Sequence, residues 1–181
     1  MTQARLKGRK VAMLATDGFE QSELMEPKRL LEEAGAQVTV IAPEGKQQIT
    51  GWSKKNWGEQ VKVDESLDQA SAEGFDALVL PGGVMNPDQL RQLPQAVDFV
   101  KAFGSAGKPI AAICHGPWTL INAGLVKGHQ VTSWPSLRQD LENAGATWVD
   151  RDVVTDGQLI TSRKPADIPA FVDAVIQSLA A

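Results

Sequence analysis

Short apolar runs alternate with stretches of helical spacing along most of this chain. The runs are rich in aliphatic and β-branched side chains, as expected of buried strands, and they cover Lys10–Thr16, Gln37–Ala42, Ala77–Leu80 and Pro109–Ile113. Apolar residues at helical intervals occur before Gly35, over Pro94–Ala106, over Trp118–Ala123, over Ser136–Ala144 and from Asp167 onward. This alternation predicts an α/β fold, a doubly wound and mostly parallel sheet sandwiched by helices.

The remaining segments predict smaller strands. Turn residues and alternating stretches within Gln47–Val63 indicate a hairpin. Further strands are expected near Gln130–Thr132, near Trp148 and over Val153–Ser162. Because the sequence contains no repeat, low-complexity tract or long linker, we expect residues 1–181 to form a single domain.

The composition narrows the class of protein. Of the 181 residues, 43% are hydrophobic and 22% are charged, and the net charge of −4 gives no reason to expect binding to nucleic acid. No apolar stretch is long enough for a membrane span or a signal peptide, so we expect no membrane partner and a cytoplasmic location. One cysteine and two distant histidines predict neither a disulfide nor a metal site, and no cofactor is expected.

Unusual residues directly follow three of the expected strands. They form the segments Asp17–Glu20, Pro81–Gly83 and Cys114–Pro117. The carboxyl ends of parallel strands meet at one edge of a sheet, where open α/β folds bind their ligands. The sequence therefore predicts that the three segments converge on one functional site.

Cys114 is the main candidate for the chemistry. It lies between a buried strand and a helix expected to begin near Pro117, where a sharp turn would project the thiol outward. The amide-rich N-terminus of that helix would favour the thiolate and lower the cysteine pKa from about 8.5 toward neutrality. The alternative is a small buried hydrophobic residue, as many free cysteines are. The position directly after a buried strand favours the functional interpretation.

The residues around the cysteine have two interpretations each. His115 is either a general base and backbone oxyanion donor or a histidine with local hydrogen bonds only. Glu20 is either an ordinary first-turn carboxylate or, when protonated, a hydrogen-bond donor to the thiolate. Gly82-Gly83 is either a plain turn or a close backbone approach to an oxyanion. His129, in an expected loop, is interpreted as a surface residue.

Together these motifs resemble the DJ-1/ThiJ/PfpI family, most closely its PfpI-like branch of intracellular protease I and general stress proteins. The segments that carry the resemblance are DGFEQSELMEP (Asp17–Pro27), FDALVLPGG (Phe75–Gly83), GKPIAAICHGPW (Gly107–Trp118), NAGATWVD (Asn143–Asp150) and TSRKPAD (Thr161–Asp167). The resemblance implies a flavodoxin-like fold, related to that of class I glutaminases, over nearly the whole chain.

The resemblance also implies roles for particular residues. Cys114 would be the nucleophile, Glu20 would be its hydrogen-bonded carboxyl partner, and the side chain of His115 would also lie at the nucleophile. The backbone N–H groups of Gly83 and His115 would form the oxyanion site. Members of the family are usually dimers, and PfpI-type members can assemble further. In PfpI-type members a glutamate of a neighbouring subunit completes a Cys-His-Glu arrangement. Asp88 is the nearest acidic residue here, with a shorter side chain in a stretch one residue longer.

One further departure from the family lies in the stretch where members often have the sequence TSYP. The position of its tyrosine is Trp134 here, and the chain contains no tyrosine at all. A possible phenolic donor is therefore missing from the expected pocket.

Three functions compete. The first is an enzyme whose Cys114 thiolate attacks small-molecule carbonyls such as methylglyoxal or glycation adducts on protein or peptide, with peptide bonds ranked lower. The resemblance implies these glyoxalase, deglycase and peptidase activities, and it also implies a homodimer. The second is a non-enzymatic redox-sensing or chaperone-like stress protein that acts through oxidation of Cys114. The third, a class I glutaminase, is disfavoured because Gln130 and Val131 follow the one distal histidine, where that chemistry needs His-x-Glu.

Overall fold

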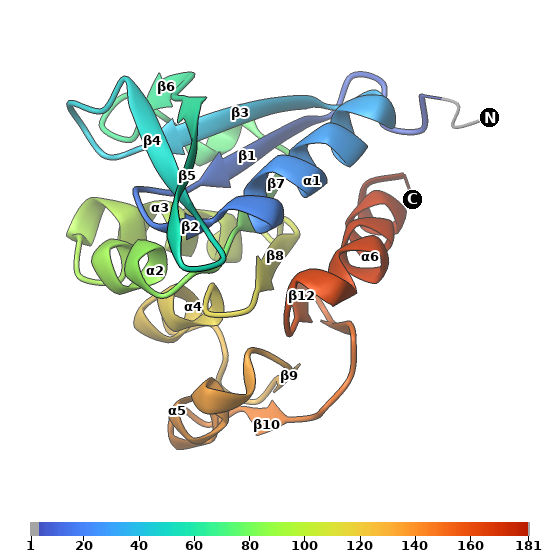
Figure 1. Cartoon of the computed structure of the whole chain (residues 1–181). Helices are drawn as coiled ribbons and strands as arrows, with labels where there is room; N and C mark the ends of the chain where they lie inside the picture. The colour runs from blue at the N-terminus through green and yellow to red at the C-terminus, as the bar shows by residue number, and fades with distance from the viewer. Residues whose placement is uncertain (1–3, 181) are drawn as a thin grey trace.

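The computed structural model describes residues 4–180 and centres on one large sheet. Seven strands lie in the order β11-β12-β8-β7-β1-β3-β6, and all pair in parallel except β11 (Figure 1). Their bounds are β1 (Lys10–Leu14), β3 (Gln37–Ala42), β6 (Glu65–Ser66), β7 (Ala77–Leu80), β8 (Ile110–Ile113), β11 (Val154–Asp156) and β12 (Leu159–Ser162). The predicted α/β fold with a mostly parallel sheet is confirmed.

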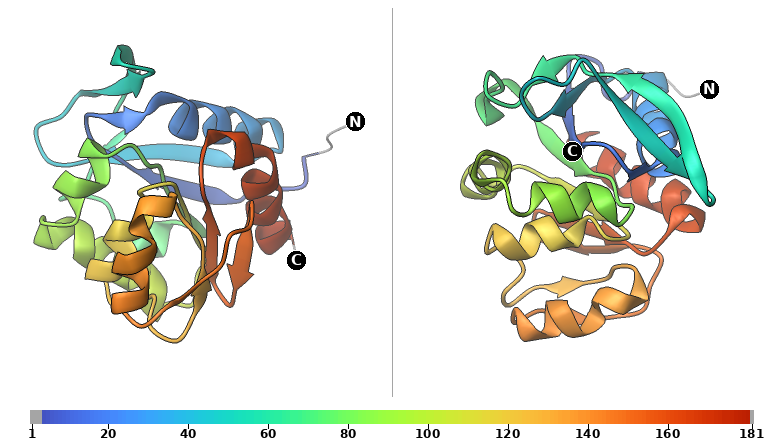
Figure 2. Two further views of the ribbon diagram at one scale, coloured as in Figure 1. Left: turned by 60° about the horizontal axis from the view of Figure 1, so that its bottom comes forward. Right: turned by 60° about the vertical axis from the view of Figure 1, so that its left-hand side comes forward.

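Helices cover both faces of this sheet (Figure 2). On one face α1 (Gln21–Glu33) packs against α6 (Ile168–Ala180), and on the other α4 (Pro117–Asn122) packs against α2 (Met85–Leu90) and α3 (Pro94–Ser105). Alternate residues of β1 serve the two cores: Val11 and Met13 join the first, and Ala12 and Leu14 join the second. Burial on both faces explains why the strands form continuous apolar runs. Among residues 4–180, no helix is long and apolar enough to cross a membrane.

The order of the strands determines where a site can form. From β1 the chain adds β3 on one side, then returns to add β7, β8 and β12 on the other side. The carboxyl ends of strands on either side of such a reversal border a crevice. The segments after β1 and β7 therefore meet at the edge that the sequence indicated.

Two smaller sheets extend from the central one. β4 (Gln48–Ser53) and β5 (Asn56–Lys62) form the expected hairpin, and the short β2 (Phe19–Glu20) pairs with β4. β9 (Gln130–Val131), β10 (Thr147–Trp148) and α5 (Arg138–Asn143) pack together at the bottom of Figure 1, where β9 also contacts β11 and β12 of the large sheet.

Several elements differ from the sequence prediction. The stretch Val153–Ser162 divides into β11 and β12, which pair antiparallel around Gly157 in the left-handed conformation (φ +59°). Five short elements were not predicted: α2, β2, β6, η1 (Ala72–Gly74) and η3 (Pro165–Asp167). The helix expected over Ser136–Ala144 is a 3-10 turn, η2 (Pro135–Leu137), followed by α5.

Candidate active site

Cys114 lies at the turn between β8 and α4. Its φ of +63° is in the left-handed region, which a residue other than glycine adopts only under constraint. Two backbone hydrogen bonds supply the constraint: the Cys114 N–H donates to the Ser162 carbonyl (3.0 Å), and the Cys114 carbonyl accepts from the Trp134 N–H (3.0 Å). This strand-turn-helix geometry resembles a nucleophile elbow and holds the thiol in one place.

Backbone N–H groups, rather than a long helix, surround the thiol. The helix expected to activate Cys114, α4, has only six residues. Burial raises the pKa of the Cys114 thiol, contrary to the lowered pKa expected from the sequence, and the backbone N–H groups of Gly83 and His115, which donate to the sulfur, offset only part of this rise. These are the two groups expected to form the oxyanion site, and the structure brings both of them to the sulfur.

The three segments singled out in the sequence meet around Cys114. The Glu20 N–H donates to the Gly82 carbonyl (3.2 Å), which joins the segment after β1 to the segment after β7. A Cβ atom on Gly82 would lie 2.7 Å from the Cβ of Cys114 and 2.5 Å from a carboxyl oxygen of Glu23. Glycine is therefore required for this close approach.

Asn86, which the sequence pattern did not single out, holds this arrangement together. Its side chain is fully buried. The amide Nδ2 donates to the carbonyls of Pro81 and Gly82, both at 3.1 Å, and Oδ1 accepts from the Thr16 N–H at 2.8 Å. Asn86 thereby ties the Pro81–Gly83 turn to the end of β1, with both ends of its amide satisfied.

The carboxyl group beside Cys114 belongs to Glu23 and not to Glu20. Glu23 is fully buried, its Oε1 accepts from the Gly82 N–H (3.0 Å), and its carboxyl interacts with the Cys114 thiol. Glu20 lies one helical turn earlier, remains partly exposed and borders a cavity of about 470 Å³ next to the β4–β5 hairpin. The expectation that Glu20 is the carboxyl partner of the thiol is therefore corrected to Glu23.

Glu23 and Cys114 titrate as a coupled pair. Burial, with the charge of Glu20 as the second cause, raises the pKa of Glu23 to about 8. Burial also raises the pKa of the Cys114 thiol, and an ionised Glu23 raises it further. Loss of the first proton from the pair leaves one proton for two groups. While Glu23 holds that proton, its carboxyl donates to the thiolate instead of repelling it.

His115 completes the site on another side of the sulfur. Its Nδ1 lies 3.1 Å from Sγ of Cys114. Burial lowers the pKa of the imidazole, so the ring is neutral near pH 7 and able to accept the thiol proton. Two indoles flank the ring: Trp118 edge to face with centroids 5.1 Å apart, and Trp134 stacked at 6.1 Å. The side chains here are thus a thiol, a carboxyl and an imidazole, and the last two are able to move protons.

Other predicted residues lie apart from this cluster. Asp88 is exposed in the first turn of α2, so its expected role would require a second copy of the chain. His129 lies near the surface with Nδ1 3.4 Å from a carboxyl oxygen of Asp156. Within residues 4–180, no group of three or more His, Cys, Asp or Glu side chains is arranged to hold a metal ion.

Comparison with known protein families matches residues 9–178 to the DJ-1/PfpI family. The chain belongs to this family. Three DJ-1/PfpI relatives illustrate its range. General stress protein 18 of Bacillus subtilis is 47% identical over 91% of this chain and 94% of its own length. "Putative cysteine protease YraA" of the same organism is 44% identical over 90% and 94%, and deglycase PfpI of Pyrococcus furiosus is 41% identical over 94% and 99%. These names support a stress-related function of the DJ-1/PfpI type.

A solved DJ-1 structure confirms the architecture independently. The crystal structure of Drosophila melanogaster DJ-1beta superposes with a TM-score of 0.86 at 32% identity, over 95% of this chain and 90% of that one. The resemblance to the DJ-1/PfpI family inferred from the motifs is thus confirmed, and so is the flavodoxin-like fold that it implied.

The close approach at Gly82 leads to a stability prediction. We expect Gly82→Ala to destabilise the protein by about 1–3 kcal/mol, because the new methyl group overlaps the atoms of Glu23 and Cys114. Urea unfolding of the variant and the wild type measures the change. Gly74→Ala is the matched control, since a Cβ there would meet nothing within 4 Å. Equal unfolding midpoints for the two variants would contradict the prediction.

Proposed function

We propose that this protein is a cysteine-dependent enzyme that acts on reactive carbonyls and on early glycation adducts of protein side chains. The observation that carries the proposal is the grouping of a constrained cysteine, a buried carboxyl with a raised pKa and a neutral imidazole in one site. Small carbonyl substrates need a thiolate, a proton carrier and donors for an oxyanion. The name of the deglycase relative supports the same choice.

The chemistry proceeds without an external oxidant or reductant. The Cys114 thiolate attacks the aldehyde-level carbon of methylglyoxal and forms a hemithioacetal. When the substrate is an adduct of methylglyoxal on an amine, the thiolate attacks the same carbon, the C–N bond breaks and the amine leaves with a proton. A proton then moves from that carbon to its neighbour through a base. The first carbon is oxidised and the second reduced, which gives a thioester that water hydrolyses to lactate and free thiol. Overall, methylglyoxal and water become lactate.

The site contains a group for each of these proposed steps. The N–H groups of Gly83 and His115 donate to the oxygen that gains charge when the thiolate adds. Glu23 carries the proton between the two carbons, because its carboxyl faces the sulfur and its pKa of about 8 suits both acid and base at neutral pH. The imidazole of His115 protonates the leaving amine.

Lactate formation tests this function. The purified protein is incubated with methylglyoxal and, separately, with methylglyoxal pre-reacted with N-acetylarginine or N-acetylcysteine. We expect lactate to form together with an equal amount of free acceptor, and a casein digest to proceed far more slowly. Absence of lactate with every substrate would reject the enzymatic proposal, whereas casein cleavage alone would favour a peptidase.

Self-association belongs to the proposal as well. We infer a homodimer that can assemble further, in which Asp88 of a neighbouring copy approaches His115 to orient its ring. Exposure of Asp88, together with the exposed Val84 just before α2, supports this inference. A cytoplasmic setting suits a lone thiol that must stay reduced. Peptide hydrolysis ranks lower, because no carboxylate among residues 4–180 hydrogen-bonds to the imidazole to orient it.

A redox-sensing role is the second candidate, and one observation favours it. Oε2 of Glu23 is buried without a hydrogen-bond partner among the described residues, next to Cys114. A protonated carboxyl at that place would hydrogen-bond to an oxygen of a sulfinic acid on Cys114. Mass spectrometry after mild peroxide treatment tests this role, and oxidation of methionines before Cys114 would argue against it.

A further inference from the structure

Two backbone contacts keep Cys114 in its left-handed conformation, and they come from different parts of the chain. The Ser162 carbonyl, which accepts from the Cys114 N–H, lies at the end of β12. The Trp134 N–H, which donates to the Cys114 carbonyl, belongs to residues 130–150, the segment that runs from β9 through α5 to the residues after β10. The geometry at the thiol therefore depends on how this 130–150 segment is fixed relative to the end of β12.

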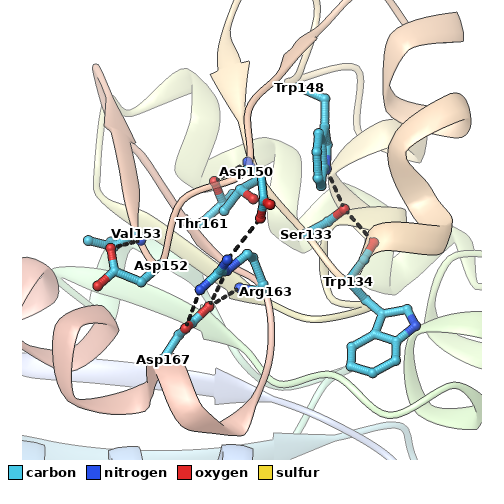
Figure 3. Close-up of polar contacts among 10 residues, drawn as sticks. Ser133, Trp134, Trp148, Asp150, Asp152, Val153, Thr161, Arg163 and Asp167 are labelled. Carbon is cyan, nitrogen blue, oxygen red and sulfur yellow. Dashed lines mark hydrogen bonds and ion pairs between the residues drawn. The ribbon is translucent and has the colours of Figure 1, made fainter.

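Arg163 connects these two parts directly. It follows Ser162 in the chain, and Nη1 of its guanidinium donates to Oδ1 of Asp150 (2.8 Å), at the end of the 130–150 segment (Figure 3). Nε and Nη2 donate to the two carboxyl oxygens of Asp167 at 2.9 and 3.0 Å, and the Arg163 backbone N–H also donates to Asp167 (3.0 Å). Because Asp167 is buried, this fork fixes the orientation in which the guanidinium meets Asp150.

Hydrogen bonds within the 130–150 segment link Asp150 back to Trp134. Two residues before Asp150, Trp148 Nε1 donates to the Ser133 hydroxyl (3.0 Å), which donates to the Trp134 carbonyl (2.8 Å), as Figure 3 also shows. Through hydrogen bonds and short stretches of chain, the contacts form a closed ring of Cys114, Trp134, Ser133, Trp148, Asp150, Arg163 and Ser162. Opening this ring at any contact leaves the backbone at the thiol less constrained.

Arg163 acts on the thiol through the backbone and not through its charge. Among residues 4–180, the charged side chains that shift the pKa of the Cys114 thiol are those of Glu23 and Glu20, and both raise it. The charge of the guanidinium is matched instead by the two carboxylates that it bonds. Lysine would keep this charge but could not bridge the two carboxylates with a planar fork, so it is not an equivalent residue at this position.

We propose that Arg163 and Asp150 are positioning residues of the reaction: their ion pair joins the end of β12 to the 130–150 segment and thereby keeps Cys114 in its left-handed conformation. That conformation places the sulfur against its two backbone N–H donors. The inference rests on the proposed function, because it explains how the nucleophile of that function is held. Neither residue touches the sulfur, and both act through the backbone contacts described above.

Breaking the ion pair loosens the turn without detaching the 130–150 segment. The Thr132 N–H still donates to Thr161 Oγ1 (2.9 Å), at a point nearer the two strands. With its N–H and carbonyl less firmly held, Cys114 leaves the left-handed region for part of the time, since a residue other than glycine is strained there. The thiolate then loses part of its hydrogen bonding to the two backbone donors, and the pKa of the thiol rises.

Alkylation of Cys114 by iodoacetamide tests the positioning without any substrate. The rate is followed against pH in the wild type, in Asp150→Ala and in Arg163→Lys. We expect both profiles to move to higher pH, with rates near pH 6.5 about threefold lower in Asp150→Ala and about tenfold lower in Arg163→Lys. The side chain of Asp150 is 68% exposed, so its removal leaves the fold and the buried fork intact. Asp152→Ala is the matched control, because this exposed carboxyl bonds to its own neighbour, Val153, and its removal should leave the profile unchanged.

A double variant and the thermal midpoints complete the test. Asp150→Ala combined with Arg163→Lys should slow alkylation no further than Arg163→Lys alone, because both changes break one contact. Additive effects would overturn the proposal, and so would a lower thermal midpoint with an unchanged pH profile, which is the result for a pair that only stabilises the fold. Shifted profiles in a protein that forms no lactate would uphold the positioning and reject the enzymatic function. Lactate formation with unchanged profiles would reject the positioning alone.

Discussion

Replacing Cys114 with serine will lower the turnover of methylglyoxal and its adducts by at least about a thousandfold, because the hydroxyl stays protonated where the thiol ionises. The elbow geometry holds whatever atom occupies this position, so the hydroxyl oxygen will lie near Gly83 and His115 without becoming a nucleophile. Lactate formation under saturating substrate measures the effect.

The serine variant should keep its fold, which makes the comparison clean. The backbone bonds to Ser162 and Trp134 do not involve the side chain, and serine is smaller than cysteine. A circular dichroism spectrum and thermal midpoint close to those of the wild type will confirm this. Full activity of Cys114→Ser would show that another group is the nucleophile.

Glu23→Gln is expected to raise the pH at which Cys114 becomes reactive by about one unit and to slow its alkylation near pH 6.5 about tenfold. In the wild type, either member of the pair can release the first proton, and Glu23 alone has a pKa of about 8, so the pair ionises at about pH 8 or below. Glutamine cannot hold the proton that Glu23 donates to the thiolate. The rate of iodoacetamide alkylation, followed against pH, measures both changes.

The shape of the two pH profiles tests the pairing itself. Above the pH of the first ionisation, the alkylation rate of the wild type should level off. The pair then holds one proton, which stays on the sulfur in a fixed share of the molecules, so the fraction of thiolate no longer changes with pH. The rate of Glu23→Gln should continue to rise, since the cysteine is then the one group of the pair that can ionise. Glu20→Gln is the matched control and should move the profile much less, because Glu20 is partly exposed. A larger shift for Glu20→Gln than for Glu23→Gln would contradict the assignment.

Most of the fold could be predicted because its strands are buried on both faces. Such strands form unbroken apolar runs, and β3 and β7 begin and end at the residues that the pattern indicated. The helix α2 could not be found in this way. Its sequence, MNPDQL, contains a proline and few apolar residues, and its Asn86 accepts a hydrogen bond from the Thr16 N–H, which is distant in the sequence.

The carboxyl partner of Cys114 was misplaced by one helical turn for a related reason. Both Glu20 and Glu23 follow β1, and a motif alone does not tell which of them faces the sulfur. The periodicity of α1 held a signal, since Glu23, Pro27 and Leu31 recur every four residues and all lie on its buried face. A carboxyl in phase with the apolar stripe of a helix is the one to expect in a buried site.

The hydrogen bond from the Cys114 N–H to the Ser162 carbonyl makes the geometry of the proposed nucleophile depend on a strand that is synthesised after it. The ribosome releases the N-terminal part of a chain first, so Glu23, Gly83 and Cys114 all emerge before β12 does. Until β12 docks against β8, the backbone at Cys114 lacks the bond that holds its strained turn. The constrained geometry of the proposed nucleophile therefore arises only after β12 has been synthesised and has docked against β8.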